Sequence, residues 1–176
     1  MPEQSREVID RFTGPYTFLS NFYPCRVTFY GLTFPSVEAA FQATKCANVQ
    51  ERAQFLDMTP SQAKRRGRQI QMRDDWDARK LTIMHNLLVH KFNENPELIS
   101  KLLATGGAVL VEGNTWHDNY WGCCTCSRCA GRRGRNNLGR LLMKLRAEYM
   151  AVWQRRAVEN EVLLHQGADP THRRLV

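Results

Sequence analysis

Residues 36–45 read SVEAAFQATK, and this stretch predicts a short helix that carries an acid and a base. Ser36 is a favoured N-cap residue, because its hydroxyl can accept a hydrogen bond from a free backbone N–H, and a glutamate in the first turn suits the helix dipole. Four side chains lie at positions i, i+3, i+4 and i+7 and therefore share one helix face: Glu38, Phe41, Gln42 and Lys45. The acid and the base could react together beside an aromatic ring. The same spacing also fits a surface Glu and Lys that flank a buried Phe41.

The segments on either side of this helix predict more helices and few strands. Tyr30-Gly31 is a hairpin signal, and Thr59-Pro60 combines a cap residue with a proline at the first helical position. The other expected elements are an extended segment at 16–22, helices starting near 50, 74 and 95, a buried strand at 108–112, and a last helix from 136 or 137 whose apolar stripe reaches residue 152. The predicted fold is a helix-rich α+β single domain over residues 1–165 with a small antiparallel sheet, followed by a flexible tail at 166–176.

The composition is that of an ordinary globular chain. Of 176 residues, 43% are hydrophobic and 24% are charged, and no apolar run approaches the roughly 20 residues that span a bilayer. The first residues, MPEQSREVIDRF, lack the apolar stretch of a signal peptide. We therefore expect a protein without membrane contact, in the cytoplasm or, in a eukaryote, the nucleus. Its six cysteines should then be thiols or metal ligands.

Basic residues exceed acidic ones by 25 to 17, which gives a formal net charge of +8. The excess is concentrated in KRRGR at 64–68 and RRGR at 132–135, and it favours a polyanionic partner such as nucleic acid or a pyrophosphate-bearing ligand. The glycine inside each cluster would let backbone N–H groups approach an anion beside the guanidinium groups. Alternatively, both clusters could be ordinary solvated surface. We prefer that interpretation for the pair Arg155-Arg156.

The stretch after the predicted strand is long, polar and aromatic, without apolar periodicity, which is typical of a functional loop. Its first part, residues 112–122, reads EGNTWHDNYWG. Trp116, Tyr120 and Trp121 could stack on a sugar or base while the amide and carboxylate groups between them orient the ligand. The same rings could instead anchor the loop to the core. His117 is interpreted as an ordinary loop histidine without a catalytic role.

Four cysteines lie within seven residues of this loop: Cys123, Cys124, Cys126 and Cys129. A C-x-x-C spacing suggests zinc, but structural zinc sites commonly use two separated pairs, and one short loop wraps a tetrahedral ion with difficulty. Cys46 or His117 could complete such a site. The favoured interpretation is a reduced, exposed loop. Because no HExxH motif is visible, no metal and no cofactor is expected in the chemistry.

Several motifs, taken in order, resemble the NADAR family, which is named for NAD and ADP-ribose. They are FLSNFYP at 18–24, E-x-x-FQ-x-x-K at 38–45, YWG at 120–122, and NLG at 137–139 ahead of LLMKLR. The resemblance covers roughly residues 10–150 and implies a helix-rich α+β fold with N-glycosidase activity. Some members look like cleavers of riboflavin-pathway intermediates, which release ribose phosphate from an aminouracil. Others reverse ADP-ribosylation of guanine, for example as antitoxins to DNA ADP-ribosyltransferases.

The resemblance also implies which residues form the pocket. By position, they are Ser20, Asn21, Glu38, Lys45, Trp116, Asp118 and Trp121. We predict Lys45 as a nucleophile, with Glu38 and Asp118 as the other catalytic groups. The predicted substrate-binding residues are Phe18, Ser20, Asn21, Gln42, Glu112, Trp116, Tyr120, Trp121, Gly122, Arg132, Arg133, Arg135 and Asn137. The chain departs from the family at Ala39, where members often carry His or Asn, and at the cysteines and GRRGR, where members have a short Gly-rich loop.

The expected function is an N-glycosidase that hydrolyses the bond between (ADP-)ribose and an amino group of a base. The positive charge favours ADP-ribosylated guanine in nucleic acid as the substrate, and a functional pairing with an ADP-ribosyltransferase would follow from the antitoxin members. One alternative is a glycosidase for ribosylaminouracil phosphate of the riboflavin pathway. Another is a non-catalytic nucleic-acid-binding module built on a zinc loop. The oligomeric state is not predicted.

Overall fold

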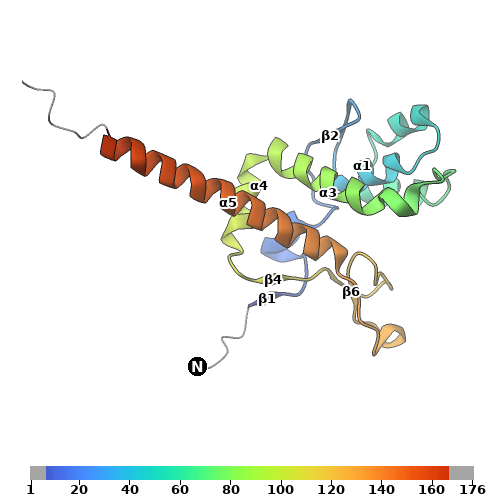
Figure 1. Ribbon diagram of the computed structural model, residues 1–176. Coiled ribbons are helices and arrows are strands. Elements are labelled where there is room, and N and C mark those ends of the chain that lie inside the picture. The colour runs from blue at the N-terminus through green and yellow to red at the C-terminus, as the bar shows by residue number, and fades with distance from the viewer. Residues whose placement is uncertain (1–6, 167–176) are drawn as a thin grey trace, which may run out of the picture.

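The computed structural model describes residues 7–166, and side chains up to residue 161. Its helices are α1 (Val37–Thr44), α2 (Pro60–Arg66), α3 (Trp76–Glu94), α4 (Pro96–Ala104) and α5 (Asn137–Gln166), with the 3-10 helices η1 (Gly14–Leu19), η2 (Val49–Phe55) and η3 (Ser127–Cys129). Its strands are β1 (Val8–Ile9), β2 (Val27–Phe29), β3 (Leu32–Phe34), β4 (Val109–Leu110), β5 (Gly113–Asn114) and β6 (Cys123–Cys124). The predicted α+β, helix-rich class is confirmed (Figure 1).

The strands differ from the single antiparallel sheet that the sequence predicts. They form three separate two-stranded pairs, of which β2–β3 is antiparallel while β1–β4 and β5–β6 are parallel. The antiparallel pair is the predicted hairpin around Tyr30-Gly31, where both residues have positive φ. The β1–β4 pair joins strands that are distant in sequence, with Val8 opposite Val109, so no local pattern predicts it.

The extended segment expected at 16–22 is also wrong in part, because η1 occupies its first half. Pro15 lies in the first turn of η1, where its fixed φ and missing N–H suit a helix start, and the Thr17 hydroxyl donates to the carbonyl of Gly14. The chain therefore turns once before it runs past Ser20 to the hairpin.

Helix α1 forms as predicted and lies inside the core. The Ser36 side chain caps it by accepting from the backbone N–H of Ala39 at 3.1 Å, and every residue of the helix is buried. It contacts η2, α2, α3 and the β2–β3 hairpin, which together cover it (Figure 1). At Gly67, just after α2, an added Cβ would lie 1.9 Å from Gln42 Oε1, so glycine is what allows α2 to pack this closely on α1.

Helix α3 supports the segment that precedes the hairpin through a buried lysine. The side chain of Lys91 is fully buried, and its Nζ donates to the carbonyls of Phe18 at 2.5 Å and Ser20 at 2.9 Å. Burial lowers the pKa of Lys91 to about 8. The two hydrogen bonds fix the backbone next to Asn21, whose carbonyl in turn accepts from the N–H of Glu38 at the start of α1.

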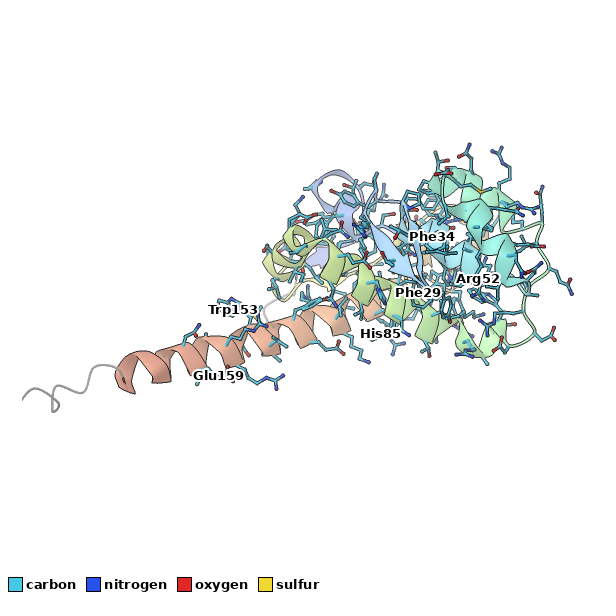
Figure 2. All side chains as sticks on the ribbon, turned by 90° about the horizontal axis from the view of Figure 1, so that it is seen from above. Phe29, Phe34, Arg52, His85, Trp153 and Glu159 are labelled. Atoms are coloured by element: carbon cyan, nitrogen blue, oxygen red, sulfur yellow. The ribbon has the colours of Figure 1, made fainter. Side chains whose placement is uncertain are left out.

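Helix α5 has an inner part that packs and an outer part that does not. Leu138, Leu142 and Leu145 are buried, and the helix contacts α3, α4 and β4. From 151 to 161 every side chain is exposed, and the helix runs away from the body, with Trp153 and Glu159 on this projecting part (Figure 2). The predicted apolar stripe therefore ends before Val152, which is 39% exposed.

The predicted flexible tail at 166–176 lies outside the described residues except for Gln166, which ends α5. Within the part of the chain that the structure describes, no helix is both long and apolar enough to cross a membrane.

Replacing Lys91 by methionine should lower the free energy of unfolding by about 2–5 kcal/mol, because two buried carbonyls would lose their donor. Urea unfolding of the wild type and the variant measures the difference. Lys101→Met, at an exposed position of α4, is the matched control and should change stability by less than about 0.5 kcal/mol. Equal stability of the Lys91→Met variant and the wild type would contradict the supporting role of this lysine.

Candidate active site

A cavity of about 470 Å³ opens where α1 meets the segment before it and the loop after β5. Nine of the predicted site residues line it: Ser20, Asn21, Glu38, Gln42, Lys45, Glu112, Trp116, Asp118 and Trp121. The structure also puts residues there that were not predicted to bind substrate: Phe12, Thr13, Phe22, Phe41, Lys64, Met84 and Gly113. The cavity thus joins the beginning, middle and end of the domain.

Helix α1 supplies an acid and a base that are both shifted toward their neutral forms. Burial raises the pKa of Glu38, against the hydrogen bond that its Oε1 accepts from Gln42 Nε2 at 2.8 Å and the charges of Lys64 and Lys45. Burial likewise lowers the pKa of Lys45, against the charge of Glu38 and with help from Lys64, Arg68 and Lys80. The alternative of a surface Glu and Lys is therefore wrong for Glu38, which is 6% exposed.

Glu38 and Lys45 share the cavity without forming an ion pair. The salt bridges among the described residues do not include this pair. Lys45 Nζ lies 5.5 Å from the ring centre of Phe41 and 5.6 Å from that of Trp76. Burial beside these rings disfavours the charged amine and lowers its pKa on balance, although the ring faces themselves attract a cation.

Glu112 is a second carboxyl group with a displaced pKa. Burial and the nearby charges of Asp118 and Glu38 raise its pKa to about 7, against the charge of Lys64. Its Oε2 is buried without a hydrogen-bond partner in the described structure. Its backbone is fixed from α5, because the Asn136 side chain accepts from the N–H of Glu112 at 3.0 Å and donates to the carbonyl of Leu110 at 2.8 Å.

Asp118 lines the cavity, but one of its oxygens already serves the loop. Oδ1 accepts from the backbone N–H groups of Tyr120 at 3.0 Å and Trp121 at 2.8 Å. The Asn114 side chain, which is 5% exposed, bonds the N–H and the carbonyl of Asp118. Asp118 therefore shapes the cavity wall at least as much as it offers a carboxylate to a ligand.

The aromatic residues of the loop divide between the cavity rim and the core. Trp116 is 58% exposed at the rim, where Lys64 Nζ lies 5.8 Å from its ring centre, so one face is free to stack on a ligand. Trp121 packs edge-on against Phe41 at 5.4 Å and Tyr120 at 4.9 Å. The anchoring interpretation thus fits Trp121, while the stacking of Trp116 on a ligand stays a prediction.

Other predicted binding residues lie outside the cavity. Phe18 is 3% exposed and belongs to the core. Tyr120 faces away, with Lys80 Nζ 4.2 Å from its ring centre. Gly122 is needed for packing, since an added Cβ would lie 2.2 Å from the carbonyl oxygen of Glu112. Asn137 is the first residue of α5, and its backbone N–H donates to the carbonyl of Tyr120. The side chain that contacts the cavity wall belongs to the preceding residue, Asn136, which accepts from the N–H of Glu112.

The basic clusters are only partly associated with the cavity. Lys64 is the member of KRRGR that reaches it. Arg132, Arg133 and Arg135 are exposed and line a separate cleft with His117, Asn119, Arg128 and Cys129, which shares no lining residue with the cavity. These arginines can therefore contact an extended anion but not the group that occupies the cavity.

The cysteine loop is arranged differently from the set of four cysteines that the sequence suggests. The side chains of Cys124, Cys126 and Cys129 gather around His117, whereas Cys123 lies apart, close to Gly134. All four cysteines are free thiols. The suggestion that His117 could complete a site with the cysteines fits this arrangement, in which His117 takes the place of Cys123 and the pairing of β5 with β6 brings it beside Cys124.

Comparisons with known proteins agree on one family. The model of the NADAR domain matches residues 9–150. The N-glycosidase Npun_R5314 of Nostoc punctiforme is 34% identical over 140 residues, which is 76% of this chain and 86% of that protein. The N-glycosidase YbiA of Escherichia coli is 36% identical over 136 residues, 76% of this chain and 81% of that protein.

Two further similarities bear on fold and function. A riboflavin biosynthesis protein of Vibrio vulnificus is 37% identical over 134 residues, but the match spans only 35% of that longer protein. The solution structure of Escherichia coli YbiA matches with a TM-score of 0.65 at 29% identity, covering 99% of this chain and all of that one.

The raised pKa of Glu112 predicts a pH dependence of stability. The folded protein should hold this proton up to about pH 7, whereas the unfolded chain loses it near the ordinary value of 4.5. Stability is therefore lost as pH rises through this window, by up to about 3 kcal/mol. Glu112→Gln should remove that part of the loss, which urea unfolding between pH 5 and 8 measures. A variant with the same pH dependence as the wild type would refute the assignment.

Proposed function

Because the chain belongs to the NADAR family, we propose that it is an N-glycosidase that hydrolyses the bond between a ribosyl or ADP-ribosyl group and an amino group of a base. The observation that carries the proposal is the unpaired Glu38 and Lys45 in one cavity, both shifted toward neutrality. Two relatives for which the match spans most of the relative's length are named N-glycosidases. The alternative of a non-catalytic binding module leaves this cavity without a purpose.

Lys45 is the proposed nucleophile. An amino-linked ribosyl group opens to an imine at C1 when the ring oxygen takes a proton, and the neutral lysine amine adds to that carbon. The base amine then leaves with a proton, and a Schiff base remains between C1 and Nζ of Lys45. Water adds to C1 and the C1–Nζ bond breaks, which releases the sugar and restores the lysine. Burial lowers the pKa of Lys45 and so increases the share of uncharged amine that can attack.

The carboxyl groups of the cavity would move the protons. Glu38, with its raised pKa, can donate a proton to the leaving amine and recover one from water. Glu112, whose pKa is raised to about 7, is a second donor in the same cavity, and its buried Oε2 has no hydrogen-bond partner among the described residues. Asp118 already accepts hydrogen bonds from two backbone N–H groups. Its proposed role is therefore to stabilise positive charge on the sugar, and not to transfer a proton.

A route without a covalent intermediate is the competitor. Water would displace the base directly, with Glu38 or Asp118 as the general base and Lys45 holding the sugar by its charge. The burial of Lys45 disfavours its charged form and therefore favours the covalent route over this one.

ADP-ribosylated guanine in nucleic acid is the proposed substrate. The exposed arginine cleft supports it, because four arginines outside the cavity suit a backbone of phosphates that continues beyond the reacting group. A functional pairing with an ADP-ribosyltransferase, and a place in the cytoplasm or nucleus, belong to this proposal. The second candidate is ribosylaminouracil phosphate, which the name of the Vibrio vulnificus relative favours.

Lys45→Arg should reduce turnover on the order of a thousandfold or more, because it keeps the charge and loses the nucleophile. Borohydride added during turnover should leave the sugar on Lys45 of the wild type, which peptide mass spectrometry can map. Lys64→Arg is the matched control in the same cavity, and its adduct should still form at Lys45. An active Lys45→Arg enzyme without any trapped adduct would exclude the covalent route and leave the glycosidase proposal standing.

Replacing Arg132, Arg133 and Arg135 together by alanine should weaken binding of an ADP-ribosylated oligonucleotide. The log–log salt slope should fall by about one unit for each phosphate group that the variant cannot bind. Affinity for ribosylaminouracil phosphate should not change, since it has no phosphate chain to reach the cleft. An unchanged slope for the oligonucleotide would mean that these arginines are solvated surface residues without a role in binding. It would favour ribosylaminouracil phosphate as the substrate.

A further inference from the structure

Four potential metal ligands meet in the loop beside the cavity: His117, Cys124, Cys126 and Cys129. One atom from each, an imidazole nitrogen and three sulfurs, lie within 4.8 Å of one another. His117 Nδ1 is 3.1 Å from the sulfur of Cys126 and 3.5 Å from that of Cys129. In a tetrahedral site with Zn–S bonds of about 2.3 Å, two sulfurs lie roughly 3.8 Å apart, so this grouping needs little change to bind an ion.

The backbone brings these ligands together from two directions. Cys124 ends β6, which pairs with β5 in a register that sets Asn114 opposite Cys124. The η3 turn folds Cys129 back onto Cys126, with its N–H bonded to the Cys126 carbonyl at 3.0 Å. His117, three residues after β5, has a φ of +69°, a strained value for a residue other than glycine, and this conformation helps to turn it toward the sulfurs.

We propose that this cluster binds one structural Zn²⁺ through three thiolates and one imidazole. Thiolate and imidazole ligands in a tetrahedral group of four select zinc among the divalent metals. Four protein ligands leave no open position for water or substrate, so the ion stabilises the loop and takes no part in the chemistry. The proposal stands whether or not the glycosidase assignment holds.

Little apolar burial holds this loop, whose shape otherwise depends on hydrogen bonds such as those of Asn114 and Asp118. Between residues 115 and 135 the buried side chains are the thiols of Cys124 and Cys129, while Arg128, Arg132, Arg133 and Arg135 are exposed and carry like charges. A metal cross-link would offset that repulsion. It would also fix Trp116 and Asp118, which flank His117 in the chain and line the cavity.

Two neighbours define the limits of the site. Cys123 points away, because its sulfur lies close to the backbone of Gly134, where an added Cβ would be 2.9 Å from it. Arg128 contacts the other ring nitrogen of His117. Zinc on Nδ1 requires a proton on Nε2, so both groups would be donors, and the exposed Arg128 side chain must turn away when the ion binds.

The first test is the zinc content of the purified full-length chain, produced in zinc-supplemented medium and kept reduced, by inductively coupled plasma mass spectrometry. The wild type should hold one zinc per chain. Cys126→Ser and Cys129→Ser should each lose most of it, and Cys123→Ser, the matched control in the same loop, should keep it. Equal zinc in all four proteins, or almost none in the wild type, would overturn the proposal.

The second test does not depend on whether the variants fold. Cobalt added to the metal-free wild type should produce the thiolate charge-transfer and visible absorption bands of a tetrahedral Co²⁺ site, and an equivalent of zinc should remove them. Absence of these bands, or the weak spectrum of octahedral cobalt, would overturn the proposal. A melting temperature that rises when zinc is restored would support the structural role.

Discussion

Glu38 is buried on helix α1 and Lys45, the C-cap of that helix, is half-buried, and withdrawing two ionisable groups from water without pairing them disfavours their charged forms. Their opposite pKa shifts are the consequence of this burial. The surrounding elements enforce it: α2 approaches closely over Gly67, the hairpin and η2 cover the helix, and α3 supports the segment next to its N-cap. The packing that stabilises the fold therefore also shifts the pKa values of both groups.

The remaining wall of the cavity is held in place mainly by hydrogen bonds. The strand before Glu112 is held through Asn136, and the loop after β5 is organised by hydrogen bonds of Asn114 and Asp118 instead of apolar packing. A polar loop of this kind keeps its shape only while its hydrogen bonds and cross-links are intact. The two walls thus combine a rigid reacting centre with a rim whose order depends on local polar contacts.

Local signals were sufficient for the parts of the fold that depend on near neighbours. The Ser36 cap predicted α1, and the spacing of Glu38 and Lys45 predicted that they share a face, which lines the cavity. Contacts between distant segments were not predictable: the β1–β4 pair, and the choice of Lys64 among five clustered residues to face the cavity. Each depends on which segments pack together, which no pattern within one segment encodes.

The outer part of α5 changes how the molecule diffuses. A helix of 30 residues is about 45 Å long, and its exposed half extends beyond a body that the inner half packs against. The projecting helix adds little mass to the molecule, but its length raises the frictional coefficient considerably. The monomer will therefore elute and sediment as a rod-like particle, so that a column calibrated with spherical proteins overstates its mass. Subunit number in this protein has to be determined from mass itself, by light scattering or native mass spectrometry, and not from hydrodynamic size.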